Sequence, residues 1–188
     1  MKMLKLLPLA ILSFVISSVS SAQMDKKEKT VEVGGAAMYP SKNIVENAVN
    51  SKDHTTLVAA VKAAGLVETL QSDGPFTVFA PVNSAFDKLP AGTVETLLKA
   101  ENKQKLTGIL TYHVVAGKWD SKSIAKMIKD GNGKAEVATV AGGKLWIMMV
   151  GKDVVLKDEN GGMAKVTIAD VYQKNGVIHV IDSVVLPK

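Results

Sequence analysis

Three histidines are the side chains of this sequence best suited to chemistry near neutral pH. The chain has 188 residues and places its imidazoles at His54, His113 and His179. Two imidazoles that bind one metal ion usually stand a few residues apart, as in His-x-x-x-His, whereas these three are spread along the whole chain. We therefore expect no metal site and no cofactor.

The neighbours of each histidine suggest what it does. His179 stands in a run otherwise rich in Val and Ile, which predicts a buried structural ring with hydrogen-bond partners. His54 precedes Thr55 in a polar turn, which predicts an exposed ring or a helix cap. A structural role is also favoured for His113, but it follows Tyr112, and a role in binding stays open for this pair.

The composition argues against catalysis. The chain has no Cys, so it has no thiol nucleophile, disulfide, zinc–thiolate site or iron–sulfur cluster. It contains no Gly-x-Ser-x-Gly motif, phosphate-binding loop or dinucleotide fingerprint. We expect a protein that is not an enzyme and that has no catalytic residues.

The amino terminus has the pattern of a secretory signal peptide. Lys2 and Lys5 precede an apolar run over residues 6–19, and small residues follow up to Ala22. The run is shorter than the roughly 20 residues that a membrane span needs. We expect residues 1–22 to be a signal peptide cleaved after Ala22, which would leave a secreted or periplasmic protein without a stable membrane anchor.

The charge of the mature chain is too small to indicate a nucleic-acid partner. The formal net charge of +5 falls to +3 without Lys2 and Lys5, and none of the 23 basic residues is Arg. Nucleic-acid binding needs a concentrated basic patch.

Residues 23–38 are polar and then glycine-rich, which predicts a flexible N-terminal segment.

Helical periodicity dominates the first part of the chain and short β-branched runs dominate the last part. A strand is expected at 76–80, and a helix is expected between Asp120 or Ser121 and Gly131. Further runs, separated by Gly-containing turns, cover 136–140, 145–150, 154–157, 166–171 and 177–185. This order predicts an α+β domain, with the last and most apolar run as a central strand.

Three segments together resemble the fasciclin (FAS1) domain family. They are GPFTVFAPVNSAF at 74–86, YHVV at 112–115 and NGVIHVIDSVVLP at 175–187, and they fit one copy over 39–188. The family more often has Thr where this chain has Val82. The resemblance implies a β-wedge of about seven strands with helices packed against it. It also implies a role in adhesion or extracellular protein interaction, commonly near the Tyr-His segment.

Most of the motif residues are expected to build the scaffold. Pro81 would end the strand ladder, Asn83 would cap the next helix, and Phe86 would anchor that helix in the core. Asp182 would accept hydrogen bonds from backbone N–H groups or a Lys. The predicted structural residues are Phe76, Phe79, Pro81, Asn83, Phe86, His179 and Asp182.

Aromatic residues supply the candidates for contact with a partner, because aromatic side chains dominate interface energetics. Tyr112 could be such an anchor or a core residue, and Trp146 lies on a strand whose second face could be covered or exposed. The predicted partner-binding residues are Tyr112, His113, Trp119 and Trp146.

These observations predict a binding protein whose partner is a protein or a surface polymer. Adhesion or surface interaction is the favoured function. The alternative is an envelope protein that binds a small apolar ligand in a cleft. The sequence indicates neither the partner nor the oligomeric state.

Overall fold

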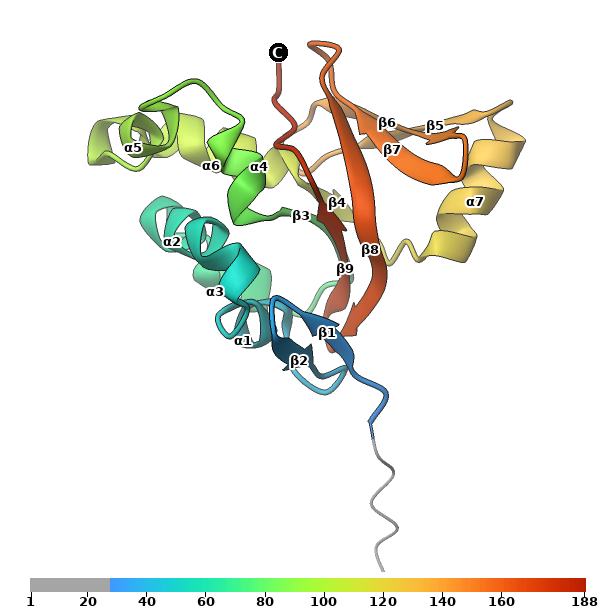
Figure 1. Ribbon diagram of the computed structural model, residues 1–188, viewed down its shortest axis with the longest axis horizontal. Coiled ribbons are helices and arrows are strands. Elements are labelled where there is room, and N and C mark those ends of the chain that lie inside the picture. The colour runs from blue at the N-terminus through green and yellow to red at the C-terminus, as the bar shows by residue number, and fades with distance from the viewer. Residues whose placement is uncertain (1–27) are drawn as a thin grey trace, which may run out of the picture.

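A seven-stranded sheet organises the part of the chain that the computed structural model describes, residues 28–188. Its order is β4-β3-β9-β8-β7-β6-β5, and only β3 and β9 are parallel (Figure 1). The strands are β3 (Phe76–Pro81), β4 (Val114–Ala116), β5 (Lys134–Ala138), β6 (Lys144–Val150), β7 (Asp153–Lys157), β8 (Met163–Gln173) and β9 (Gly176–Ile181). The predicted signal peptide, residues 1–22, lies outside the described residues.

The two ends of the sheet approach each other. Val115 forms an isolated bridge with Thr139, and the Val140 N–H donates to the Val114 carbonyl at 2.8 Å. The sheet is therefore almost closed into a wedge. The predicted α+β fold of about seven strands with packed helices is confirmed.

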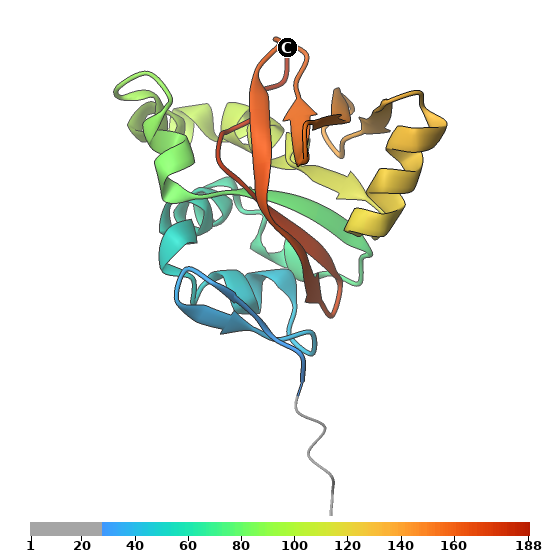
Figure 2. The same cartoon turned by 45° about the vertical axis from the view of Figure 1, so that its right-hand side comes forward.

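Six of the helices pack on one side of the central strands, and the seventh lies at the far end of the wedge against β5 and β6 (Figures 1 and 2). The first six are α1 (Ile44–Ala48), α2 (Thr55–Ala64), α3 (Val67–Gln71), α4 (Asn83–Asp87), α5 (Thr93–Leu97) and α6 (Lys103–Tyr112). The seventh is α7 (Ser121–Asp130), and single 3-10 turns lie at Lys52–His54 and Ala100–Asn102. Asp120 caps α7 by accepting a hydrogen bond from the Ser123 N–H, which decides between the two starts, Asp120 and Ser121, that the sequence left open.

Strands β3 and β9 separate two hydrophobic cores. Val78 and Ile178 point into the core beneath α1–α6, whereas Phe79 and Ile181 point into the interior of the wedge. This alternation follows from the two-residue period of a strand. The prediction that the last run forms a central strand is confirmed, because β9 lies between β3 and β8 and is buried along its whole length.

The segment before the helices is partly ordered, which differs from the flexible lead expected over 23–38. Strands β1 (Val31–Val33) and β2 (Ala36–Met38) form an antiparallel hairpin, and Val33 and Met38 are buried in the core under the helices. Gly34 and Gly35 have φ values of 59° and 73°, which a tight hairpin turn requires. Apolar burial at alternate positions of two short strands therefore holds this segment to the domain.

Asn83 also departs from its predicted role. Val82 is the N-cap of α4, and Asn83 is the first residue of that helix. The Asn83 side chain reaches instead to α2, where Oδ1 accepts from the Thr56 N–H at 3.0 Å, and Nδ2 donates to the Lys52 carbonyl at 2.8 Å. Asn83 thus satisfies an orphan N–H at the start of a helix that precedes it in the chain.

The two hairpin glycines offer a matched test of this packing. Both have positive φ, but a Cβ on Gly34 would collide with Ser51 Oγ and the Asp53 backbone, whereas a Cβ on Gly35 would meet nothing within 4 Å. We expect Gly35→Ala to lower the free energy of unfolding by about 1 kcal/mol and Gly34→Ala by clearly more, roughly 2–3 kcal/mol. Urea denaturation of both variants checks this, and equal losses would contradict the packing of the hairpin turn.

Candidate functional site

Tyr112 lies at the carboxyl end of α6 with its ring fully buried in the wedge. Its hydroxyl donates to the Lys144 carbonyl at 2.5 Å and accepts from the Glu159 N–H at 3.3 Å. The ring packs so closely on Gly143 that a Cβ there would overlap it. Burial, the largest effect, raises the pKa of Tyr112 to about 12.

His113 is the next residue and is also buried, with 2% of its surface exposed. Its Nδ1 lies 2.9 Å from the Ile109 carbonyl, which can only accept, so Nδ1 carries the proton. Its Nε2 then accepts from the Val185 N–H at 3.2 Å. Burial lowers the pKa of His113 to about 4, so the ring is neutral at neutral pH.

The four residues predicted for partner contact are not brought together on one surface. Tyr112 and His113 present no side-chain surface in this conformation, and the structure gives them packing and hydrogen-bonding roles. Trp119 is half-buried against the wedge core, and its Nε1 donates to the Ala116 carbonyl at 2.8 Å. Trp146 lies apart from them, on the outer side of β6.

His179 lies inside the wedge, where its ring stacks on Phe79 with centroids 5.7 Å apart. Its Nε2 donates to the Trp119 carbonyl at 2.7 Å, and the Asp170 N–H lies 3.4 Å from its Nδ1. Burial lowers the pKa of His179. Both nitrogens of this ring and of His113 are therefore engaged by the backbone, and neither ring is free to act as a general base.

Asp182 follows β9 and connects it to β8. Its Oδ1 accepts from the Lys165 N–H at 2.9 Å, and Lys88 forms an ion pair with Oδ2 at 3.7 Å. Partial burial works against ionisation, but these hydrogen bonds, the Ser183 hydroxyl and the Lys88 charge together lower the pKa of Asp182. The backbone donor and the Lys are the two kinds of partner expected from the sequence.

The outer sheet face is the side of β5–β8 turned away from the wedge interior. The strand registers place apolar and charged side chains next to each other on it. Its apolar members are Trp146, Met148, Val150, Val155 and Met163, and its charged members are Lys134, Glu136, Lys144, Asp153, Lys157 and Lys165. Of its apolar members, Val150 and Met163 are exposed, Trp146 and Met148 are half-buried, and Val155 is buried.

Polar contacts hold Trp146 in place on this face. Its Nε1 donates to Glu136 at 2.9 Å, and the Lys134 ammonium lies 5.5 Å from the ring centroid. Lys144 forms an ion pair with the same carboxylate at 2.9 Å. Hydrogen bonds from Lys144 and then from Trp146 lower the pKa of Glu136.

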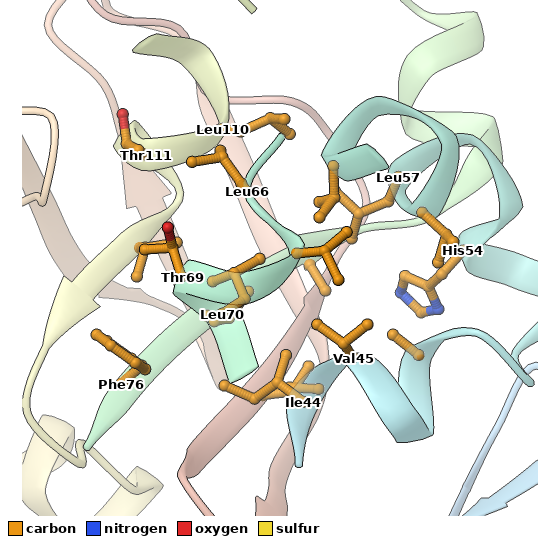
Figure 3. Close-up of a pocket in the computed structure, with 18 of the residues that line it drawn as sticks. Ile44, Val45, His54, Leu57, Leu66, Thr69, Leu70, Phe76, Leu110 and Thr111 are labelled. Atoms are coloured by element: carbon orange, nitrogen blue, oxygen red, sulfur yellow. The ribbon is translucent and has the colours of Figure 1, made fainter. Parts of the chain in front are cut away.

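The helical side of the fold contains a cavity of about 70 Å³ between α1, α2, α3, α6 and the strands β3 and β9. Figure 3 shows His54 at one end of this cavity and Phe76 at the other. The polar side chains that line it are His54, Lys62, Thr69 and Thr111, and all other lining residues are apolar. The sequence did not indicate this site, because the apolar faces of these helices predict only that their residues are buried in a hydrophobic core.

His54 corrects the expectation of an exposed or capping ring, because only 2% of its surface is exposed. Lys52, Asp53 and Thr55 face solvent, but the 3-10 turn at Lys52–His54 directs the ring inward, where Nδ1 lies 2.9 Å from the buried Ser51 Oγ. Within residues 28–188 no three acidic, His or Cys side chains gather as metal ligands. In the same range, no helix has the length and apolarity that a bilayer crossing demands.

The hydroxyl of Tyr112 can be tested with a matched pair of substitutions. Tyr112→Phe keeps the packed ring but leaves the Glu159 N–H and the Lys144 carbonyl without their partner, and we expect a loss of about 1–3 kcal/mol in the free energy of unfolding. Tyr172→Phe removes a hydroxyl from an exposed ring and should cost less than about 0.5 kcal/mol. Chemical denaturation measures both, and equal effects would show that the Tyr112 contacts do not stabilise the fold.

The buried imidazoles predict acid sensitivity. His113 has an ordinary pKa of 6.5 when unfolded and about 4 when folded, so between these values the unfolded chain binds more protons. The free energy of unfolding should therefore fall as the pH drops below 6.5 and level off below about 4, by roughly 3 kcal/mol for His113. Urea titrations across this range check it. His113→Gln should show a shallower slope, and an unchanged slope would overturn the assignment.

Comparisons with known proteins agree with this geometry. The fasciclin domain model matches residues 52–187. Protein sll1483 of Synechocystis sp. is 51% identical over 170 residues, which cover 90% of this chain and 87% of that protein. The cell surface glycolipoprotein MPB83 of Mycobacterium bovis is 34% identical over 160 residues, which cover 82% of this chain and 64% of that protein.

A solved structure shares the fold. The FAS1 domain pair of the insect cell adhesion molecule Fasciclin I matches with a TM-score of 0.69 at 19% identity, over 79% of this chain and 52% of that chain. The family model matches this chain over most of its length. The matched residues form the seven-stranded wedge, most of the helical layer and the buried Tyr-His pair. The chain belongs to the fasciclin domain family.

Proposed function

We propose that this protein is a secreted or periplasmic binding protein that acts in adhesion or in another interaction with a protein or polymer at a cell surface. Membership of the fasciclin family supports this, as does the similarity to a mycobacterial protein named for its place on the cell surface. The predicted signal peptide at residues 1–22 supports export. No catalytic role is proposed, because two of the three imidazoles have both nitrogens engaged by the backbone.

The outer sheet face is the observation that carries this proposal. Val150 is 52% exposed and Met163 is 57% exposed, and the half-buried Trp146 and Met148 lie on β6 opposite Glu136 and Lys134 of β5. Aromatic and Met side chains are enriched at the centres of protein interfaces. The charged members of the face are four lysines and two carboxylates, so the face fits a partner that carries anionic groups.

A variant of this face tests the proposal. Beads coated with the mature protein should adhere to intact cells of the source organism, and Trp146→Ser combined with Met148→Ser should lower the adherent fraction severalfold, because it truncates the apolar centre of the face. Tyr39→Ser, which removes an aromatic ring of 39% exposure beside β2, is the matched control and should adhere normally. Adhesion by the double variant equal to that of the unmodified protein, at an unchanged melting temperature, would place the contact elsewhere.

A second candidate function is the binding of a small apolar molecule on the opposite side of the fold. The cavity beneath α1–α3 favours it, because the side chains that line it are almost all apolar. This function does not compete with the first, since the outer sheet face contributes none of the lining residues.

A further inference from the structure

The cavity beneath the helices combines an apolar wall with one unpartnered polar atom. Ile44, Val45, Leu57, Leu66 and Leu70 form much of its wall, and Figure 3 shows their side chains converging from α1, α2 and α3. An apolar space of this kind favours small apolar molecules over water. The polar exception at its deep end is His54.

His54 has one nitrogen engaged and one without a partner. Ser51 Oγ lies 2.9 Å from Nδ1, whereas the buried Nε2 finds no hydrogen-bond partner of acceptable geometry in the part of the chain that the structure describes. Burial lowers the pKa of His54, although the nearby Ala80 carbonyl and the Asp53 carboxylate both oppose that drop. The ring is therefore neutral at neutral pH, and its Nε2 lacks a hydrogen bond of good geometry even though the Ala80 carbonyl lies near the ring.

The hydrogen bond with Ser51 does not fix the tautomer of the His54 ring. A hydroxyl donates or accepts, so the Ser51 hydroxyl is compatible with either neutral tautomer of His54, and Nε2 is an acceptor in one and a donor in the other. A hydroxyl group on a ligand satisfies both cases. A carboxylate would match only one tautomer and would bring a charge into the apolar interior, since Lys62 lies on the exposed side of α2.

The size of the cavity limits the ligand. One water molecule needs roughly 10–15 Å³ of such space, so about 70 Å³ has room for a single small ring or a short branched chain. A larger molecule would have to extend out of the cavity toward solvent. The part of the ligand inside the cavity is therefore small and uncharged, and it is apolar apart from the group that meets His54.

We propose that this cavity binds a small neutral alcohol or phenol, whose ring or branched chain fills the apolar space and whose hydroxyl pairs with His54 Nε2. The inference rests on the second candidate function, the binding of a small apolar molecule, and adds the chemical class of the ligand and the residue that recognises it. It is independent of the outer sheet face.

Phenol and toluene test the proposal, because they have the same number of heavy atoms and differ in the hydroxyl. Binding to the mature protein is measured by NMR titration, with the unmodified protein and His54→Leu compared for each probe. We expect both probes to bind the unmodified protein. His54→Leu should weaken phenol about three- to tenfold, the effect of one hydrogen bond, and change toluene less than about twofold.

Two further variants locate the site. Ala48→Phe adds a ring to the cavity wall and should abolish binding of both probes, whereas Tyr172→Phe changes an exposed ring outside the cavity and should bind both normally. A readout without substitution protects the test if His54→Leu does not fold. The ¹⁵N chemical shift of His54 Nε2 in the unmodified protein should move with phenol and stay in place with toluene.

The outcomes separate the two levels of the proposal. Binding of toluene and phenol with equal sensitivity to His54→Leu, or a His54 shift that does not respond to phenol, overturns the role of the hydroxyl and leaves apolar binding standing. Binding of neither probe, or binding that persists in Ala48→Phe, overturns both the ligand class and the second candidate function.

Discussion

The side chains of Tyr112 and His113 connect the end of α6 to three backbone segments that lie far from it in the sequence. Tyr112 binds the Lys144 carbonyl at the start of β6 and the Glu159 N–H in the β7–β8 turn, and His113 binds the Val185 N–H after β9. Both residues are buried, so these contacts form only while the phenol and the imidazole are uncharged. The closed wedge therefore depends on a neutral pair whose hydrogen bonds are all made to the main chain.

The same region fixes the carboxyl end of the chain. Asp158 accepts from the Gly162 N–H at 2.7 Å within its own turn and from the Leu186 N–H at 3.0 Å, so the turn below Tyr112 also holds the last residues. Every polar atom named in the wedge interior has a partner, and its apolar side chains form one continuous cluster. The helical side is built differently, because short helices of five residues leave a cavity with an unpartnered imidazole nitrogen. A small molecule can enter only where the packing leaves this space.

Local patterns predicted the elements well, and contacts between distant segments explain what they missed. The period of two in β3 and β9 predicted which residues share a face, and the polar residues Asp120 and Ser121 bracketed the start of α7. Asn83 was assigned to its own helix, because spacing along the chain cannot show that a side chain caps a helix that precedes it by almost thirty residues. Similarly, the polar neighbours of His54 gave no sign of its burial, and the family resemblance marked Tyr112 and His113 without showing whether the family motif serves contact or closure.

The contrast between Trp146 and the Tyr-His pair shows how the proposed binding surface is compatible with a densely packed wedge. Glu136 and Lys134 hold the indole in one position by contacts that are themselves solvated, so the ring stays ordered without being buried. A side chain ordered before binding loses little conformational entropy when a partner covers it. The lysines around it keep the exposed apolar area dispersed among charges, which limits self-association. The outer sheet face can therefore present apolar anchors to a partner while the hydrogen bonds that close the wedge stay inside and unchanged.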